Sequence, residues 1–446
     1  MNHVNPKSVL SLGVIAALAI AVATAIQVGR KPASEGAQVA QPLLPELREH
    51  INDVSAVTLT GGGDKPIATL EKGAAGWSVK EKGGYRADAG KLREFLLKLA
   101  DASLLEPKTQ SDKRYAELGV EDVKAADAKG VLVGLAGLAK PTQVILGHYN
   151  ARSAGTFVRR AGEAQSWLAK GNLSADANVA NWLDKALADI PATRLREVVL
   201  TAPDGKVVRA YKDQEGDANF KVAGVPKGRE LSSEYAANGL GTALAGLRFD
   251  DVFAAPDAAP PADGKVNKAH FAAFDGLVVD ATAWKKDEKL YARFAVSLDE
   301  KAAQAKLAAD QAKARADWEA EEKARAAKQA ESSQTSADKD VAKKDEAKRD
   351  GAAAAVDARP APMPAAPLAV SDPAKDAQQR LEALRKEVAE LQQRFEGWTY
   401  VLPNYRFESL AKSMDELLKP LDSGKGDKGK VVLPPPSSVL DALPKH

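Results

Sequence analysis

The sequence of 446 residues contains no cysteine. This absence excludes disulfides, thiolate nucleophiles, cysteine-ligated zinc, iron–sulfur clusters and lipid attachment through an N-terminal cysteine. The sequence also lacks an excess of charge of either sign. Its 63 Lys and Arg residues are interspersed with 61 Asp and Glu residues, and the net charge is +2. Nucleic-acid-binding proteins carry a basic patch or stripe, so we expect no nucleic-acid partner.

Motifs for catalysis and nucleotide binding are missing as well. The sequence contains no H-E-x-x-H, no G-x-S-x-G and no G-x-x-x-x-G-K-[ST]. Residues 239–246, GLGTALAG, partly match a dinucleotide-binding loop. Their third glycine comes two residues late, however, and the segment falls inside a predicted helix. We therefore predict no cofactor and no cofactor-binding residue.

Isolated polar residues give no better evidence of a site. His148 is the best single candidate, and its neighbours along the chain are Tyr149, Arg152, Ser153, Arg159 and Arg160. A solvated hairpin loop explains this cluster better than a catalytic centre does. Asp250 and Asp251 are adjacent, and adjacent strand residues point to opposite faces, which disfavours a shared metal ion. We predict no catalytic residue, no metal ligand and no enzymatic activity. A hydrolase of unknown substrate is the third of the alternative functions, after the two described below.

The tryptophans recur at matching repeat positions or strand positions. The five concerned are Trp77, Trp167, Trp182, Trp284 and Trp398. We expect them in the hydrophobic core. The other interpretation, a set of platforms for sugar rings, underlies the alternative function of an independent protein that binds peptidoglycan or polysaccharide in the cell envelope.

One long uncharged run, residues 9–28, lies near the N-terminus. Its length suffices to cross a hydrocarbon core of about 30 Å at about 1.5 Å per residue. We favour a transmembrane anchor, with residues 1–8 as a short cytoplasmic tail, over a signal peptide cut after residues 23–25. Both interpretations place the body outside the inner membrane. Residues 29–50 are expected to be a linker.

The remaining chain repeats itself. VSAVTLTGGGDKPIATL (54–70) and LREVVLTAPDGKVVRAY (195–211) are both predicted β-hairpins, and GWSVKE and ANFKVAG follow them as third strands. An amphipathic helix comes next in each copy, over residues 88–107 and 232–253, and a helix closes each copy at residues 174–187 and 405–419. We predict an α+β fold of two tandem antiparallel-sheet-plus-helix modules.

The boundaries of the modules follow from this comparison. Module 1 is expected over residues 51–193, and module 2 over residues 194–298 and 397–420. Trp77 and Phe220 should be equivalent. Residues 421–446 are expected to be a flexible tail.

Residues 299–396 interrupt the second copy with a helical insertion that has a disordered tip. The corresponding connection in the first copy is the short turn AGEAQ, 161–165. A coiled-coil-like apolar seam comprises Leu381, Leu384, Val388, Leu391 and Phe395. Two alternatives remain open: the seam joins the two helices into a projecting hairpin, or it packs on the protein's own domain.

Five segments together resemble a bacterial family of exported proteins defined by a domain of unknown function. They are GWSVKE, RYAELGVED, TFVRR, WLDKALADIPATRLREVVLTAPDG and GWTYVLP. The resemblance covers residues 51–420 without the insertion. It implies one N-terminal membrane span, an exported α+β body, and genes that lie beside ABC-type permeases and the gliding-motility-type ABC transporter auxiliary protein. The resemblance therefore implies a periplasmic accessory subunit of an ABC transport complex, bound to an ABC permease or auxiliary protein and attached to the inner membrane through residues 9–28. It transfers no catalytic residue.

Overall fold

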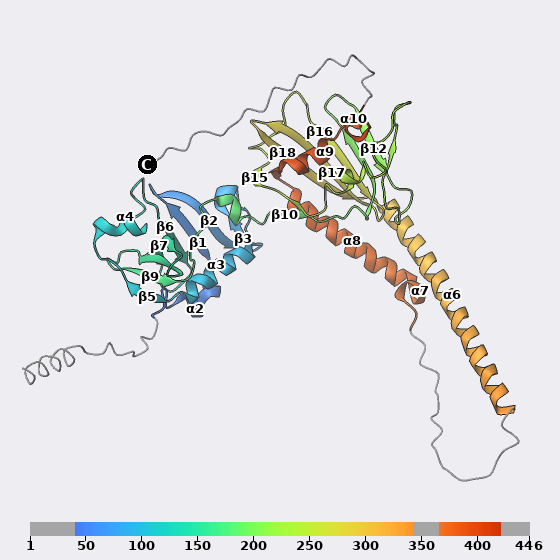
Figure 1. The fold of residues 1–446 in the computed structure, drawn as a ribbon, viewed down its shortest axis with the longest axis horizontal. Coiled ribbons are helices and arrows are strands. Elements are labelled where there is room, and N and C mark those ends of the chain that lie inside the picture. The colour runs from blue at the N-terminus through green and yellow to red at the C-terminus, as the bar shows by residue number, and fades with distance from the viewer. Residues whose placement is uncertain (1–40, 342–364, 421–446) are drawn as a thin grey trace, which may run out of the picture. The chain divides into compact units, whose positions relative to one another are not determined.

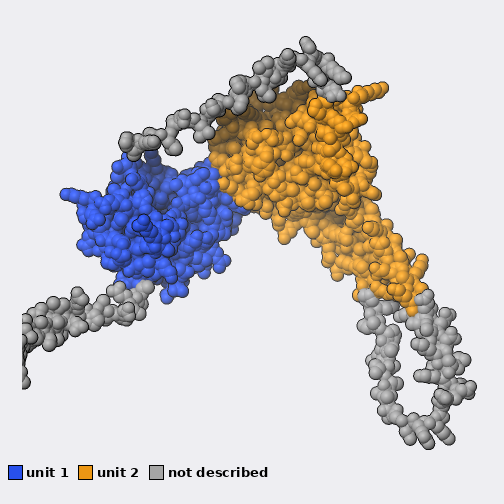
Figure 2. All heavy atoms as spheres, viewed as in Figure 1, with its two compact units in different colours: residues 1–184 blue, residues 185–446 orange. Residues whose placement is uncertain are grey.

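A computed structural model describes residues 41–341 and 365–420 (Figure 1). The membrane span predicted over residues 9–28, residues 342–364 of the tip predicted to be disordered, and the predicted flexible tail 421–446 lie outside these residues. Among the helices of the described ranges, none is long and apolar enough to cross a membrane. The chain divides between Asp184 and Lys185 into two compact units (Figure 2).

Unit 1 is built on a nine-stranded antiparallel sheet with the order β4-β3-β2-β1-β6-β7-β8-β9-β5. Its strands are β1 (Ala56–Gly61), β2 (Lys65–Gly73), β3 (Gly76–Val79), β4 (Tyr85–Arg86), β5 (Leu104–Pro107), β6 (Val131–Ala136), β7 (Thr142–Asn150), β8 (Gly155–Arg160) and β9 (Ser166–Lys170). Its helices are α2 (Leu47–His50), α3 (Ala89–Asp101) and α4 (Tyr115–Leu118), with short 3-10 turns η1 (Ile51–Asp53), η2 (Lys80–Lys82), η3 (Asp112–Arg114) and η4 (Val179–Trp182).

The alternation of apolar residues in unit 1 directs one face of the sheet into a core. Val57 and Leu59 on β1 are both at most 1% exposed, and the residue between them faces outward. Helix α3 begins where the sequence predicts it, because the Asp88 side chain accepts a hydrogen bond from the Lys91 amide and caps its first turn. The prediction of a helix as far as residue 107 is wrong, because α3 ends at Asp101 and Leu104–Pro107 form β5, which pairs with β9. Its buried residues are Leu92, Phe95, Leu96, Leu99 and Ala100. The apolar stripe of α3 thus contributes to the core of unit 1.

Unit 2 contains an eight-stranded antiparallel sheet with the order β13-β12-β11-β16-β17-β18-β19-β15. Its strands are β11 (Leu195–Thr201), β12 (Val207–Tyr211), β13 (Lys221–Ala223), β15 (Asp251–Ala254), β16 (Asn267–Ala273), β17 (Leu277–Lys286), β18 (Lys289–Leu298) and β19 (Trp398–Val401). A separate pair joins β10 (Ala186–Ala188) to β14 (Leu247–Arg248), and the short helices are α5 (Asn238–Gly241), α9 (Asn404–Ala411) and α10 (Met414–Leu417). Two large antiparallel sheets with helices confirm the expected α+β class.

The two sheets have the same strand order. Read from one edge, β3-β2-β1-β6-β7-β8-β9-β5 in unit 1 corresponds strand by strand to β13-β12-β11-β16-β17-β18-β19-β15 in unit 2, and β4 is an additional edge strand. The pairing registers agree as well: Val57 pairs with Leu70, which pairs with Val79, and Val198 pairs with Ala210, which pairs with Val222. Counting back two residues from Val79 and Val222 gives Trp77 and Phe220.

Several expected boundaries differ from the structure. Unit 2 begins at Lys185, before the expected boundary at residue 193, because β10 already pairs with β14. The helix expected over 174–187 is only the turn η4 followed by β10. The helix expected over 232–253 is reduced to α5, and three glycines at 239, 241 and 246 explain this because glycine disfavours a helix by about 1 kcal/mol each. The helix expected over 405–419 is split into α9 and α10.

The insertion lies between two neighbouring strands of the second sheet, β18 and β19. It consists of α6 (Glu300–Val341), α7 (Leu368–Ser371) and α8 (Pro373–Phe395), which we call the arm. In unit 1 the corresponding strands β8 and β9 are joined by residues 161–165 alone. Figure 1 shows the inner ends of α6 and α8 apart at unit 2 and the two helices converging toward α7.

Candidate functional site

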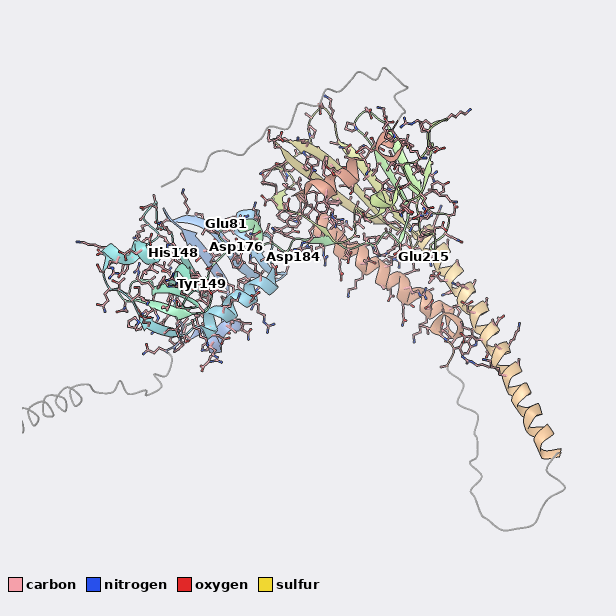
Figure 3. All side chains as sticks on the ribbon, viewed as in Figure 1. Glu81, His148, Tyr149, Asp176, Asp184 and Glu215 are labelled. Carbon is pink, nitrogen blue, oxygen red and sulfur yellow. The ribbon has the colours of Figure 1, made fainter. Side chains whose placement is uncertain are left out.

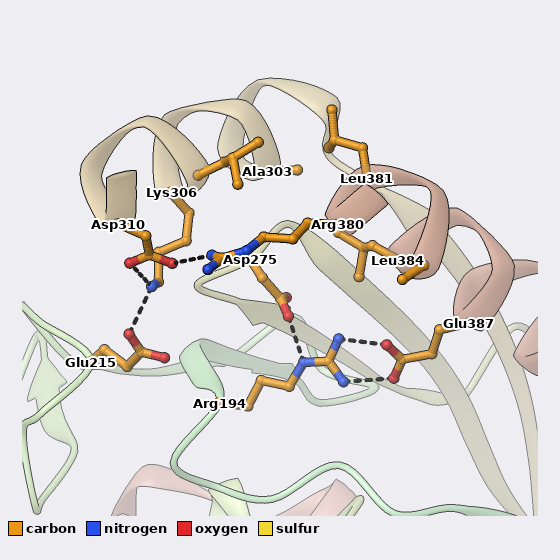
Figure 4. A pocket seen from close by; sticks show the side chains of 12 residues that line it. Arg194, Glu215, Asp275, Ala303, Lys306, Asp310, Arg380, Leu381, Leu384 and Glu387 are labelled. Carbon is orange, nitrogen blue, oxygen red and sulfur yellow. Dashed lines mark hydrogen bonds and ion pairs between the residues drawn. The ribbon is translucent and has the colours of Figure 1, made fainter. Parts of the chain in front are cut away.

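A cleft of unit 2 lies at the root of the arm, where α6 and α8 meet the sheet (Figure 4). Its volume is about 390 Å³. Three cations and four carboxylates line it, together with the apolar side chains of both helices: Arg194, Lys306, Arg380, Glu215, Asp275, Asp310, Glu387, Ala303, Leu307, Leu381, Ala383 and Leu384.

Arg194 joins α8 to the sheet. Its Nε donates to Asp275 Oδ2 at 2.7 Å, and its two terminal nitrogens donate to the two carboxylate oxygens of Glu387 at 2.6 and 2.8 Å. Asp275 lies in the turn between β16 and β17, whereas Glu387 lies on α8. Burial lowers the pKa of Arg194, but the hydrogen bonds and charges of Glu387 and Asp275 outweigh it and leave the pKa above its ordinary value. The bidentate geometry fixes both the position and the rotation of α8.

Lys306 makes the corresponding link for α6. Its Nζ lies 2.9 Å from Glu215 Oε2 in the loop after β12 and 2.5 Å from Asp310 Oδ1 one turn further along α6. Burial lowers the pKa of Lys306, but its hydrogen bonds to Asp310 and Glu215 outweigh this effect and raise the pKa above its ordinary value. α6 is therefore also fixed to unit 2 by a partly buried ion pair.

Polar contacts also join the two helices to each other. Arg385 on α8 donates to both carboxylate oxygens of Glu300 on α6 at 3.1 Å. Further out, Gln311 Nε2 donates to Pro373 O at 2.8 Å and to Asp376 Oδ2 at 3.0 Å. The start of α8 is thus held beside residue 311 of α6, and α6 continues beyond this point.

The inner end of the apolar seam predicted on α8 is directed at the sheet. Phe395 is 2% exposed, and its ring centroid lies 5.3 Å from that of Phe294 on β18. Leu391 is also buried, whereas Leu381, Leu384 and Val388 are half-buried. Of the two alternatives left open by the sequence, packing on the protein's own domain holds for the inner end of α8. The inner turns of α8 are part of the core of unit 2.

The cleft has the properties of a joint between helices and sheet. Each of its three cations is bound to a carboxylate of the same chain, Arg380 through Asp310 at 3.4 Å and Asp376 at 3.2 Å. Within residues 41–341 and 365–420, no group of three or more His, Asp or Glu side chains is placed to hold a metal ion. The arrangement is suited to orienting the arm.

The polar residues around His148 are divided among different contacts; Figure 3 labels His148 and Tyr149 in unit 1. His148 is exposed on β7, where its ring lies against Gly119, and Tyr149 is 43% exposed. Arg152 is an exposed loop residue whose amide donates to Asn150 Oδ1 at 3.0 Å. The Ser153 amide donates to the same Asn150 Oδ1 at 3.4 Å. The two remaining arginines have other partners: Arg159 binds Asp122, and Arg160 binds the carbonyls of Pro42 and Leu43.

The remaining sequence candidates also have structural roles. Asp250 is exposed, and Asp251 accepts a hydrogen bond from the Val252 amide at 2.9 Å. Gly241 of the segment 239–246 packs beneath Phe220.

The expectation that all five tryptophans are buried is wrong for three of them. Trp182 and Trp284 are each 1% exposed, as expected for core residues. Trp77, Trp167 and Trp398 are only half-buried. A strand pattern identifies the face of a residue but does not show whether a helix or loop covers that face.

Sequence reasoning placed Leu381 and Leu384 in the apolar seam but did not find the charged residues of the cleft. These charged residues are spread from residue 194 to residue 387, and each is a common residue type in an ordinary helix, turn or loop. Their only local signal is the set of acidic and basic residues on α6 and α8, which is typical of any exposed helix.

Comparison with known families adds one finding. Residues 77–268 match the model of a domain of unknown function, DUF4340. The match begins at Trp77 on β3 and ends in β16, so it includes parts of both units and stops before the arm. No curated protein and no solved structure matches the chain.

Proposed function

We propose that this protein is a non-catalytic docking subunit: a membrane-anchored periplasmic accessory protein of an ABC-type transport complex. The arm is its docking element. The resemblance described above supports the ABC context, and the uncharged run at residues 9–28 supports the anchor. The DUF4340 match is consistent with this family context but adds no activity.

The observation that carries the proposal is a long helix whose first turns are fixed to unit 2 and which continues well beyond them. α6 has 42 residues, and its Gln311 side chain donates to Pro373 O at the start of α8. α7 packs beside it, and α6 then continues to Val341. Residues 312–341 would measure about 45 Å at about 1.5 Å per residue. We call residues 312–341 and α7 the outer arm.

The rest of the arm, residues 300–311 of α6 together with α8, we call the inner arm. It is held in place by the Arg194 and Lys306 ion pairs and the Phe294–Phe395 contact. A rigidly oriented helix that leaves its own domain has no evident use in the fold of that domain. Rigid presentation lowers the entropy cost of binding a partner. We therefore assign partner recognition to the outer arm.

We further infer that the two units are tandem copies of one module, on the basis of their common strand order and register. In this interpretation the arm was added at a turn of the second copy. Insertion at a turn preserves the strand pairs on either side, and the closure entropy of a loop grows only slowly with its length.

The proposal is tested by site-specific crosslinking in native membranes. A photo-crosslinking amino acid replaces Lys313 or Glu322, both exposed on the outer arm, and in a control it replaces Val207, which is 52% exposed on β12. We expect the two outer-arm positions to crosslink to an ABC permease or its auxiliary protein, and the control position not to. Equal crosslinking at all three positions, or crosslinking only to proteins unrelated to transport, would contradict the proposal.

A further inference from the structure

Unit 1 carries an apolar groove that is separate from the arm. The groove has a volume of about 380 Å³ and lies between α3, the turn η1 and the β2–β3 hairpin. Its lining is mostly aliphatic, with Trp77 at one side and Leu92, Leu96 and Leu97 of α3 at the other. Leu97 is 42% exposed and Trp77 is half-buried, so substantial apolar surface faces solvent.

The equivalent position in unit 2 is closed. Phe220, which corresponds to Trp77 in the pairing register, is only 3% exposed. The Lys212 ammonium lies 4.6 Å from the centre of its ring, and Gly241 packs close to the edge of the ring. The two units therefore differ at this position: unit 2 covers a smaller aromatic ring, whereas unit 1 leaves a larger ring open.

The polar residues of the groove are donors. Lys72, Arg93 and Asn52 line it, and no Asp or Glu does. Lys72 Nζ donates one hydrogen bond to the Asn52 carbonyl at 3.2 Å, and an ammonium group has two further protons to donate. A ligand that fits this groove has an apolar body and exposes hydrogen-bond acceptors. It has few backbone N–H groups, because each N–H that loses its hydrogen bond to water without gaining a partner would cost binding free energy.

We propose that the groove binds residues 431–446 of the same chain, VVLPPPSSVLDALPKH, with residues 433–436 (LPPP) against Trp77. Three consecutive prolines have carbonyl acceptors but no backbone N–H, which matches a rim composed of donors. Proline-rich segments are preorganised in the extended polyproline conformation and dock in aromatic-lined grooves. Val431, Val432 and Leu433 supply aliphatic side chains for the α3 side, and Asp441 supplies a negative charge for Lys72 or Arg93.

A short connection tethers the proposed ligand to the described part of the chain. Ten residues, 421–430, separate the last described residue from the proposed ligand, and an extended chain of ten residues spans up to about 35 Å. Where such a connection spans the distance to a site, a tethered ligand has an effective concentration in the millimolar range, and even a weak site is then largely occupied. The proposal does not depend on the function proposed for the arm.

The experiment compares two full-length chains in lipid nanodiscs. One has the natural sequence, and in the other Pro434, Pro435 and Pro436 are replaced by serine, which frees the groove. The probe is a fluorescent synthetic peptide of residues 431–446, and its binding is followed by anisotropy. We expect saturable binding to the substituted chain, at least tenfold tighter than to the natural chain, whose own segment competes. A peptide with the same three serines should not bind.

Groove variants locate the site. In the substituted chain, Trp77→Ala and Arg93→Glu should each weaken peptide binding at least tenfold, whereas Lys140→Glu in the exposed β6–β7 connection should not. Trp77→Phe, which keeps an aromatic ring, should retain most of the binding, and thermal unfolding verifies that each variant is folded.

Four results would overturn the proposal. The first is that the peptide does not bind to the substituted chain, and the second is that Trp77→Ala leaves its binding unchanged. The third is that the peptide binds equally well to the natural and the substituted chains. The fourth is that the natural tail competes with the peptide to an extent that depends on the protein concentration. The last result would show that a second copy supplies the segment.

Discussion

Arg159 on β8 and Arg293 on β18 occupy the same position in the two sheets. Arg159 is paired with Ile145 on β7, and Arg293 is paired with Thr282 on β17. Ile145 and Thr282 occupy matching positions when the strand registers are followed from β1 in unit 1 and from β11 in unit 2. Each guanidinium binds backbone carbonyls of the segment that follows the edge strand β5 or β15: Arg159 binds Val120 O at 2.8 Å, and Arg293 binds Ala258 O at 3.1 Å.

The surroundings of these two arginines are also alike. The Arg159 guanidinium lies 4.5 Å from the centre of the Tyr115 ring, and that of Arg293 lies 5.7 Å from the centre of the Trp284 ring. The neighbouring strand supplies a fully buried hydroxyl in each case, from Ser166 or Thr399. One arginine in each unit thus holds an irregular segment against the sheet, which is the strongest local support for duplication.

Arg159→Lys and Arg293→Lys should each destabilise their unit by about 1–3 kcal/mol. Lysine keeps the charge but cannot reach several carbonyls at once, as the planar guanidinium does. Urea unfolding followed by tryptophan fluorescence measures the loss. Arg152→Lys, an exchange at an exposed loop position, is the control and should change stability by less than about 0.5 kcal/mol. Equal, small effects at all three positions would show that the two arginines do not hold these segments.

Two nested deletions separate the outer arm from the core of unit 2. Removal of residues 312–372 with a short Gly/Ser link should leave a folded, soluble protein, because the Gln311 side chain already contacts Pro373 O at 2.8 Å. Removal of residues 299–396 should cause aggregation, because it also removes Phe395 and uncovers Phe294. Thermal midpoint and solubility are measured for both. If the larger deletion behaved like the smaller one, α8 would not be part of the core.

Glu387→Gln should destabilise unit 2 by about 1–2 kcal/mol. It removes the charge from the bidentate pair with Arg194, but Arg194 keeps Asp275, and the Glu387 side chain is 39% exposed. A double-mutant cycle with Arg194→Gln should give a coupling energy of about 1 kcal/mol. Glu390→Gln, in an exposed pair at 4.0 Å with Lys386, is the matched control. Additive effects in the cycle would mean that the pair does not fix α8.

The stability of unit 1 should fall in acid partly through Asp176. Partial burial raises the pKa of this carboxyl, but hydrogen bonds from Lys91 and Asn178 outweigh this effect, so its pKa lies below the ordinary 3.8. A pKa that is lower in the folded state gives stability above the unfolded-state pKa, and this stability is lost as the pH falls through the folded-state pKa. Asp176→Asn should therefore flatten the loss of stability below about pH 4. Urea titrations at several pH values test this, and parallel curves for the two proteins would contradict it.

The parts of the fold that could be predicted are those encoded locally. Alternating Val57 and Leu59 mark a strand, and Asp88 before an apolar stripe marks the start of α3. The charged, alanine-rich composition of residues 299–396 marks an insertion regardless of its contacts.

The remaining features depend on tertiary contacts. Arg194 and Glu387 are separated by 193 positions and meet only because α8 returns to the sheet. Phe220 is covered and Trp77 is not, although both follow the same local pattern, because the covering groups come from other segments. The short helices after residue 174 differ from the prediction because amphipathic spacing alone did not account for glycines and early strand pairing.

The central claim, that the outer arm docks a transport partner, is tested most directly by co-purification from native membranes. The natural chain and the chain without residues 312–372 are expressed at equal levels, and the amount of ABC permease or auxiliary protein recovered with each is quantified. We predict at least a tenfold loss of partner with the deleted chain, while its thermal midpoint and membrane fraction remain those of the natural chain. Undiminished recovery of the partner with a folded, deleted chain would contradict the account.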